Sequence, residues 1–225
     1  MPASFFRVIE KGYHRPMNII QFIHENKDIF FHTAVRMQLS GCTSMLDVGC
    51  GQNSSIRSEI KSIYSEGIEI DKKSVAISKK NKLHNKYKVG DITKLDVYYK
   101  PKSFDAVVAM DVIEHLTKKQ AFLFMSSMER IAKKKVIILT PNGFCKQGHY
   151  DNNPYQDHHS GWSTKDFVRR GYTVYGLRSF HWLRGEFATI KYKPWFFWGL
   201  IAFITEPILY FFPTKSFDLF AVKTI

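Results

Sequence analysis

The regular alternation of short apolar runs with helical patterns, between residues 44 and 139, constrains the fold more than any other feature of the sequence. Five runs have the character of buried strands: residues 44–48, 64–70, 87–89, 104–110 and 136–139. Helical patterns precede and separate them at residues 17–39, 54–61, 72–84 and 117–133. Strands separated by helices usually lie parallel in one sheet. The sequence therefore predicts an α/β fold with a parallel sheet, preceded by an N-terminal helical cap in residues 1–40.

The last third of the chain departs from this alternation. Ser163 and Asp166 form a capping-box pattern ahead of a short helix that ends at Gly171. Residues 172–177 and 217–222 then have the pattern of two further strands. We therefore predict a single domain over residues 1–225, with an aromatic insertion at residues 180–215 between its last two strands.

The charge of the chain raises the question of an anionic partner. Lys and Arg number 33 and Asp and Glu number 20, which gives a net charge of +13. Ten of the lysines fall between residues 72 and 102, among polar residues and without an aromatic stacking platform beyond three tyrosines. This pattern favours a solvated face, so nucleic acid is not the expected partner. Three cysteines without a C-x-x-C pair and the absence of a signal-peptide pattern favour a reducing, cytoplasmic compartment.

A glycine-rich turn follows the first predicted strand. Gly49 and Gly51 stand between that strand and a helix, an arrangement that brings backbone N–H groups close to a ligand. Ser54, preceded by Gln52 and Asn53, fits the dinucleotide fingerprint poorly. Asp47 at the end of the strand would repel a diphosphate and attract a cationic ligand. The turn therefore favours a cationic ligand over a dinucleotide.

Acidic residues also close the next two strands. Glu69 follows Asp47 by 22 residues, close to the spacing at which a carboxylate accepts both ribose hydroxyls. Asp71 stands directly before a helix, so we assign the ribose to Glu69 and helix capping to Asp71, with Asp71 as the alternative ribose ligand. Asp91 and Ile92 after the third strand offer a carboxylate and an apolar wall, which suit an adenine ring.

Taken as a set, these segments resemble the class I S-adenosylmethionine-dependent methyltransferases. The resemblance covers residues 44–143 and rests on LDVGCG (46–51), GIEID (67–71), GDI (90–92), FDAVVAMDVIEHL (104–116) and VIILTPNG (136–143). It implies a Rossmann-like, seven-stranded, mostly parallel sheet with an antiparallel C-terminal strand and helices on both faces. It also implies S-adenosylmethionine as the cofactor.

The resemblance also implies roles for individual residues. The methionine part of the cofactor would lie against Asp47, Gly49 and Gly51, the ribose against Glu69, and the adenine against Asp91 and Ile92. Beneath the sulfonium and facing the acceptor would lie Asp111, Val112 and His115.

Methyl transfer asks the protein mainly for positioning and for exclusion of water, but an acceptor hydroxyl must lose its proton. Histidine is the usual base near neutral pH, and His115 and His159 are the candidates. His115 has the alternative role of structuring the turn before Thr117. The segment 159–162 resembles one in members that act on saccharide or natural-product acceptors. A metal site formed by residues of the 149–159 loop has little support, and no metal is predicted.

The aromatic insertion contains eighteen residues, 195–212, with a single charge at Glu206. That length would allow a membrane span, but the strands on both sides must return to the same body, which excludes a single span. The Glu206–Pro207 step is expected to break the helix into two halves, which form a re-entrant or surface-lying helical pair at an anionic membrane with basic residues on the flanks. The alternative is a hydrophobic cap on the sheet or a homodimer interface.

The sequence therefore predicts a methyltransferase that acts on an oxygen of a small-molecule or lipid-linked acceptor, such as a glycan precursor. A quinone-type ring O- or C-methyltransferase is the main alternative. A nucleic-acid methyltransferase has less support, because no N-P-P-[YFW]-like signature follows the fourth strand. An adenine-cofactor-binding regulatory module or an NAD-dependent protein is the alternative from another class. The expected location is the cytoplasm, with peripheral membrane contact through residues 195–212.

Overall fold

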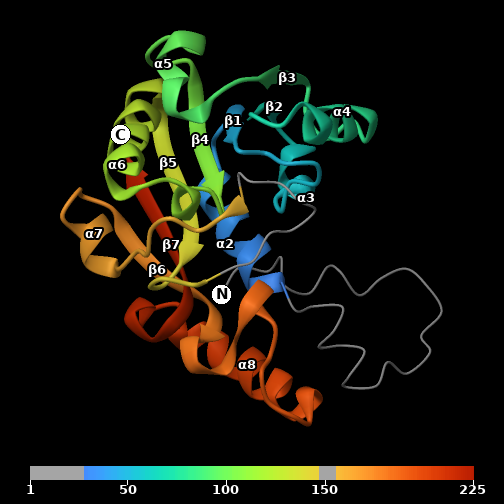
Figure 1. Ribbon diagram of the computed structural model, residues 1–225, viewed down its shortest axis with the longest axis vertical. Helices are drawn as coiled ribbons and strands as arrows, with labels where there is room; N and C mark the ends of the chain where they lie inside the picture. Colours follow the sequence, from blue (N-terminus) through green and yellow to red (C-terminus); the bar gives the residue numbers. More distant parts are fainter. Residues whose placement is uncertain (1–27, 147–155) are drawn as a thin grey trace.

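A computed structural model describes residues 28–146 and 156–225, and its centre is a seven-stranded sheet in the order β3-β2-β1-β4-β5-β7-β6 (Figure 1). The first five strands are parallel, and β7 runs antiparallel to both β5 and β6. The predicted Rossmann-like α/β fold with antiparallel C-terminal strands is therefore confirmed. The strands are β1 (Ser44–Val48), β2 (Tyr64–Glu69), β3 (Lys86–Val89), β4 (Phe104–Met110), β5 (Ala132–Pro141), β6 (Thr173–Phe180) and β7 (Ser216–Thr224).

Helices cover both faces of the sheet (Figure 1). One hydrophobic cluster joins one face to α5, α6 and α7, and a second joins the opposite face to α2 and α3. Alternate residues of β4 enter the two clusters, with Val107 in the first and Val108 in the second. A strand buried on both sides needs an apolar sequence, which β4 has from Ala106 to Met110. The helices are α2 (Ile29–Leu39), α3 (Arg57–Ile60), α4 (Lys72–Lys80), α5 (Leu95–Tyr98), α6 (Lys118–Ile131), α7 (Thr164–Val168) and α8 (Trp195–Leu209).

Three helices in the N-terminal half differ from their predicted extents, and one of them is α4, which was expected to reach residue 84 but ends at Lys80. The helix expected at residues 54–61 begins only at Arg57, because Ser54 hydrogen-bonds to Asp47 and to the backbone N–H of Ile56 and so remains part of the loop. The helix expected from residue 17 is described only from Ile29, since residues 1–27 lie outside the described part of the chain.

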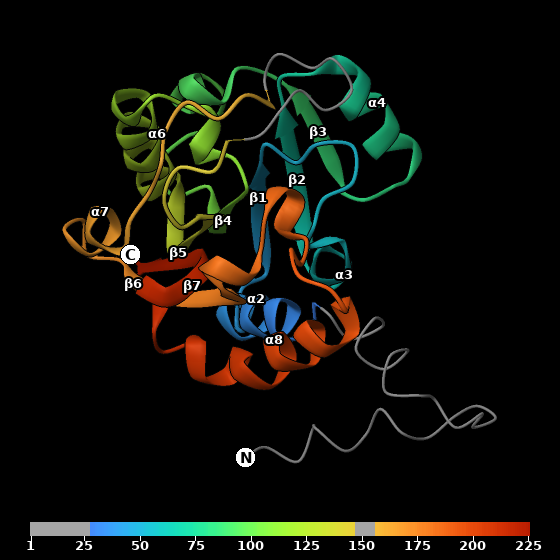
Figure 2. The ribbon, with the colours of Figure 1, turned by 60° about the horizontal axis from the view of Figure 1, so that its bottom comes forward.

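The predicted break of the aromatic helix at Pro207 is wrong. α8 is one continuous helix from Trp195 to Leu209, with Pro207 inside it. Pro207 lies in the last turn, so the missing N–H removes a single bond to the Phe203 carbonyl while the rest of the helix packs against β6 and α2. The rings of Phe30 in α2 and Phe203 in α8 are 5.3 Å apart, and Figure 2 shows the two helices side by side.

α8 is apolar on more than one side. A buried stripe at helical spacing faces the protein and consists of Gly199, Ala202, Glu206 and Leu209. The outer side exposes Trp195, Phe196, Phe197, Ile204 and Ile208, each to at least 45%. None of the described helices combines the length and hydropathy needed to cross a membrane. The division into cap, single domain and insertion stays a prediction.

Candidate active site

The loop after β1 is held against the end of β4 by glycine geometry. Gly49 and Gly51 have φ angles of +70° and +55°, in the left-handed region. A Cβ atom at Gly49 would lie 2.6 Å from Cγ2 of Val112, whereas a Cβ at Gly51 would meet open space. Gly49 thus permits the close approach of the loop to Val112, and Gly51 leaves open space beside its backbone that a ligand could fill. A cavity of about 200 Å³ lies at this loop and is lined by Asp47, Gly49, Cys50, Gly51, Asn53, Ser54, Ser55, Met110 and Asp111.

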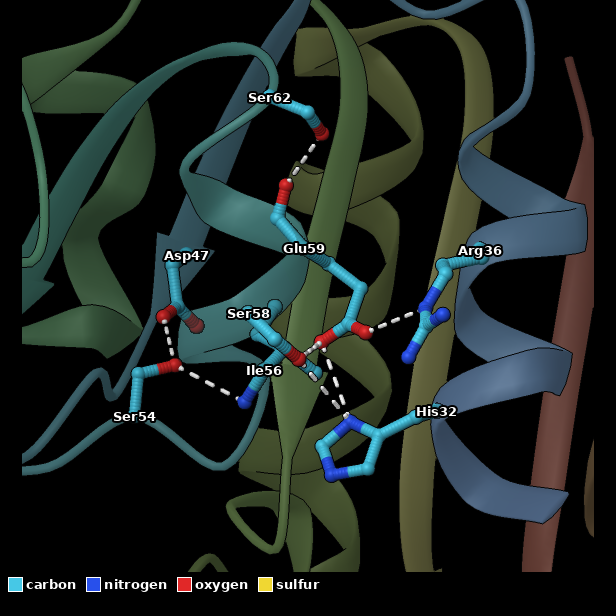
Figure 3. Close-up of polar contacts among 8 residues, drawn as sticks. All are labelled: His32, Arg36, Asp47, Ser54, Ile56, Ser58, Glu59 and Ser62. Atoms are coloured by element: carbon cyan, nitrogen blue, oxygen red, sulfur yellow. Dashed lines mark hydrogen bonds and ion pairs between the residues drawn. The ribbon is translucent and has the colours of Figure 1, made fainter. Parts of the chain in front are cut away.

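The buried carboxylate of Asp47 fixes the same loop from beneath. Its Oδ2 accepts a hydrogen bond from Ser54 Oγ at 2.7 Å, and His84 Nε2 lies 3.0 Å from the same oxygen. Ser54 Oγ in turn accepts from the Ile56 N–H, as Figure 3 shows. Asp47 therefore lines the small cavity and also sets the path of the chain that leaves it.

Glu59 attaches the following helix to α2. Its buried carboxylate accepts hydrogen bonds from Arg36 Nε at 3.0 Å and Ser58 Oγ at 2.7 Å, and His32 Nδ1 lies 3.2 Å away (Figure 3). Because α3 begins directly after the glycine loop, this network holds the far end of the loop as Asp47 holds the near end.

Glu69 and Asp71 have different local roles. Glu69 Oε2 accepts from the Gly51 N–H at 3.1 Å, and Glu69 Oε1 accepts from the N–H groups of Ile70 and Asp71. Asp71 instead caps α4 by accepting from the N–H groups of Lys73 and Ser74, and hydrogen bonding by Ser74 lowers the Asp71 pKa. The predicted cap at Asp71 is confirmed, and Glu69 is the acid that lies beside the glycine loop.

Asp91 closes the third strand in a similar way. Its Oδ1 accepts from the N–H and hydroxyl of Thr93, which caps the short 3-10 turn η2 (Ile92–Lys94). The Ile92 side chain is half-buried against the first hydrophobic cluster. Both residues therefore lie at the strand end where the sequence analysis places them.

Asp111 links the small cavity to a larger one. It follows β4 with a φ of +55°, its N–H donates to the Leu139 carbonyl at 2.9 Å, and it lines both cavities. The larger cavity has a volume of about 660 Å³. Polar side chains on its walls include Asp111, Glu114, His115, His158, Arg178 and Arg184, and its apolar lining includes Phe30, Trp195, Ala202 and Phe203. The aromatic helix α8 therefore forms a wall of this cavity.

Two imidazoles lie together in the larger cavity. The rings of His115 and His158 have centroids 4.9 Å apart, and burial lowers the pKa of both. Burial therefore favours the neutral form of both imidazoles. His159, the predicted catalytic candidate, has an exposed side chain that does not line the cavity, and its backbone N–H donates to the Glu114 carbonyl at 2.8 Å. The structure thus places His158 beside His115, while His159 faces solvent.

Glu114 is a cavity residue that the sequence analysis did not single out. It is buried, its Oε2 accepts from Thr140 Oγ1 at 2.9 Å, and burial together with the nearby Asp111 raises its pKa. The available signal was an acid beside a histidine just after a buried strand. His149 and Asp151, considered as metal ligands, lie outside the described residues.

Arg178 contributes a cation to the cavity from a bulge in β6. The register of β6 against β7 shifts between Leu177 and Phe180, and Arg178 has a φ of +59°. Its Nη1 lies 2.8 Å from Oδ2 of Asp218, which is fully buried, and its Nη2 lies 3.7 Å from Oδ2 of Asp111. Burial raises the Asp218 pKa against the opposing effect of this guanidinium.

Comparison with known proteins decides the class of enzyme. The sequence profile of a methyltransferase domain matches residues 39–164, which is more than half of the chain. The chain belongs to this methyltransferase family. It is an enzyme whose cofactor is S-adenosylmethionine, so the fold, the activity and the cofactor implied by the sequence resemblance are confirmed.

Solved structures share the fold of this methyltransferase at low sequence identity. A SAM-dependent methyltransferase from Archaeoglobus fulgidus has a TM-score of 0.57 and 15% identity, over 91% of this chain and 99% of that one. The methyltransferase domain of a bacterial Hen1 protein has a TM-score of 0.54 and 18% identity, over 89% and 99%.

A third neighbour is the magnesium protoporphyrin IX methyltransferase from Synechocystis, crystallised with bound SAM. Its TM-score is 0.52 and its identity 16%, over 97% of this chain and 89% of that one. At such identities these likenesses concern the fold alone. No curated protein sequence matches the methyltransferase significantly.

Proposed function

We propose that the enzyme transfers the methyl group of S-adenosylmethionine to an oxygen of a small-molecule or lipid-linked acceptor with a substantial apolar part, such as a glycan precursor. The observation that supports this proposal is the 660 Å³ cavity, which adjoins the glycine loop at Asp111. Its lining includes the polar groups of Asp111 and His115, and α8 contributes aromatic and small apolar side chains beside the carboxyl group of Glu206. An amphipathic acceptor would satisfy both parts of this lining.

The residues around the glycine loop fit the cofactor. The open space above Gly51 admits a ligand, and the acids Asp47 and Asp111 favour a sulfonium cation. We assign the methionine part to Asp47, Gly49 and Gly51, with Asp111 and Val112 beneath the sulfonium. We assign the ribose to Glu69, whose carboxylate has acceptor capacity beyond its present hydrogen bonds, and the adenine to Asp91 and Ile92.

The transfer itself requires one proton to leave. The acceptor oxygen forms a bond to the methyl carbon while the carbon–sulfur bond breaks, so the cofactor departs as neutral S-adenosylhomocysteine. A hydroxyl acceptor must also release its proton. We assign this proton transfer to His115, because its imidazole lines the cavity and burial keeps it neutral.

A quinone-type ring O- or C-methyltransferase is the second candidate. The apolar wall formed by Phe30, Phe203 and Trp195 would suit a ring with a prenyl tail. A carbon acceptor would yield a new C–CH₃ bond, which is distinguished from a methyl ether by the chemical shift of the transferred ¹³C-methyl group. A nucleic-acid acceptor gains no support from this lining.

Labelled methyl transfer tests the proposal. The enzyme and S-adenosylmethionine with a labelled methyl group would be incubated with aqueous small-molecule, lipid and RNA extracts. We expect label in an ether methyl of the small-molecule or lipid fraction. Label confined to RNA would overturn the acceptor assignment, and failure to bind S-adenosylhomocysteine would contradict the cofactor assignment.

We also propose that the enzyme is cytoplasmic and contacts anionic membranes through the outer side of α8. Trp195, Phe196 and Phe197 are about half exposed, and Lys191 and Lys193 lie directly before them. Exposed aromatics beside basic residues suit a membrane interface. Burial of roughly 300 Å² of such surface would favour the bilayer by several kcal/mol before ordering costs.

Vesicle co-sedimentation tests this contact. Binding should be stronger to anionic than to neutral vesicles and should fall with salt. The triple variant Trp195→Ser/Phe196→Ser/Phe197→Ser should remain folded and stay in the supernatant. The contrary outcome is a wild type that does not bind anionic vesicles and forms a dimer, together with a triple variant that is monomeric. That result would assign this face of α8 to a homodimer interface.

A further inference from the structure

Three potential metal ligands meet at the polar end of the large cavity. Glu114, His115 and His158 each offer one ligand atom, and these atoms lie within 4.8 Å of one another. Zinc-like cations bind imidazole nitrogen and carboxylate oxygen at about 2.0–2.2 Å. A small inward adjustment of the side chains would therefore let all three bind a single cation.

Hydrogen bonding fixes the two imidazoles in the tautomer that a metal requires. His115 Nδ1 lies 3.1 Å from the carbonyl oxygen of Asp157, and His158 Nδ1 contacts the carbonyl oxygen of Cys145. A carbonyl oxygen can only accept, so each Nδ1 carries the proton and each Nε2 keeps its lone pair. Histidines that bind metals typically donate their other ring N–H to a carbonyl or carboxylate in this way.

Glu114 supplies an independent observation. Its side chain is 2% exposed, and its Oε1 has no hydrogen-bond partner among the described residues, although Oε2 accepts from Thr140. An unpaired oxygen on a buried carboxyl group is costly. A cation between Glu114 and the imidazoles would satisfy it.

We propose that Glu114, His115 and His158 bind a divalent transition-metal cation that holds the acceptor. A mixed nitrogen and oxygen ligand set suits Zn²⁺, Fe²⁺ or Mn²⁺ better than Mg²⁺ or Ca²⁺, which prefer oxygen. Three protein ligands leave coordination positions open toward the cavity, as in catalytic metal sites. This proposal departs from the sequence-based expectation of no metal.

The substrate class follows from those open positions, and this step rests on the proposed function. An acceptor with two neighbouring oxygens, such as a vicinal diol or a catechol, would occupy two adjacent positions. Coordination lowers the pKa of a hydroxyl, so its proton leaves to solvent near neutral pH. The resulting oxygen anion then takes the methyl group as the carbon–sulfur bond breaks. With Nε2 bound to the cation, His115 has no lone pair left to accept the proton, so this site would replace direct proton transfer to His115.

Direct titration with Zn²⁺ tests the site without any acceptor. The full chain, stripped with a chelator, would be titrated by calorimetry, and we expect one Zn²⁺ per chain. Affinity should fall at least roughly 100-fold in Glu114→Gln and in His158→Ala. His159→Ala and His181→Ala, which remove exposed imidazoles, should bind like the wild type. Absence of binding, or equal affinity in all four variants, would overturn the proposal.

Two further measurements keep the outcomes distinct. Thermal unfolding identifies a variant that has lost its fold, and His158→Ala, in a half-buried loop position, supports the conclusion if Glu114→Gln is unstable. S-adenosylhomocysteine affinity is measured on the same samples. If that ligand binds and Zn²⁺ does not, only the metal site is refuted. If that ligand fails to bind, the proposed function fails whatever the Zn²⁺ result.

Discussion

The two halves of the enzyme use their acidic residues differently. In the cofactor half, residues 44–143, Glu69, Asp71 and Asp91 accept hydrogen bonds from backbone N–H groups within three residues of themselves. In the acceptor half, residues 173–224, the acids depend on distant partners: Asp218 pairs with Arg178, and Glu206 accepts from the Arg178 N–H. Local sequence therefore specifies these caps and strand ends of the first half, although Asp47 and Glu69 also bind distant partners there, whereas the two acids of the second half depend on tertiary structure.

This difference predicts that charge removal will be most damaging in the acceptor half. Arg178→Met leaves the buried Asp218 without its counter-ion, and we expect the free energy of unfolding at pH 8 to fall by about 3–5 kcal/mol. Denaturant unfolding followed by circular dichroism would measure it.

Arg36→Met is the matched control, because the buried partner of Arg36, Glu59, lies in the cofactor half. Arg36 is exposed, and its buried partner Glu59 keeps the Ser58 and His32 contacts, so a loss of about 1 kcal/mol or less is expected. Equal losses in the two variants would show that the halves do not differ in this respect.

Turnover and cofactor affinity should also depend on different residues. His115→Ala removes a cavity imidazole, and turnover should fall by roughly 100-fold or more with little change in S-adenosylmethionine affinity. His159→Ala should retain near-normal turnover, because its side chain faces solvent. Methyl-transfer rates between pH 6 and 9 would show this. A His159 variant slower than the His115 variant would restore His159 as the catalytic candidate.

Cofactor affinity should depend on the acid beside the glycine loop. Glu69→Ala should weaken S-adenosylhomocysteine binding by about 1.5–3 kcal/mol, through loss of hydrogen bonds to a charged group. Asp71→Ala should instead lower stability by about 1 kcal/mol through loss of the α4 cap and leave affinity nearly unchanged. Calorimetry of both variants distinguishes these effects, and the reverse pattern would move the ribose to Asp71.

The halves should also respond to pH in opposite directions. The Thr43 N–H, with Lys134, lowers the pKa of Asp105 to about 2, so the stability it contributes above pH 3.8 is lost as the pH falls toward 2. The pKa of Asp218 is raised, so the effect has the opposite sign. The stability that Asp218 contributes is fully present below pH 3.8 and is lost as the pH rises toward neutrality.

Two asparagine variants measure these contributions. Asp105→Asn should flatten the acid limb of the stability profile by about 2 kcal/mol, and Asp218→Asn should flatten the profile between pH 4 and 7 by about 4 kcal/mol. Urea unfolding across this range would supply the slopes. If the slope of unfolding free energy against pH is the same in both variants as in the wild type, the pH dependence arises from other groups.

The cofactor half could be predicted well because its signals are local. The limits of β4 and the cap at Asp71 appear in the structure as the sequence indicated. Each depends on an apolar run or on a side chain within three residues of the backbone group that it binds. The seven-stranded, mostly parallel sheet followed from the family resemblance rather than from such signals.

The acceptor half could be predicted less well. No pattern indicates the bulge that aims Arg178 at Asp218, since that geometry depends on the neighbouring strand. In an irregular loop, periodicity cannot decide whether His158 or His159 faces the cavity. Pro207 indicated a break that packing of α8 on β6 overrides.

The position of β7 has a consequence for how the enzyme opens. Within the described residues, β6 pairs only with β7, and α8 packs on β6, so separation of β7 from β5 would release the acceptor wall as one cooperative unit. The parallel pairs of β1 with β2 and β4 would stay intact. Amide hydrogens of β6 and β7 should therefore exchange together and sooner than those of β1 and β4. Such a partial unfolding would admit a bulky acceptor while the cofactor remains bound.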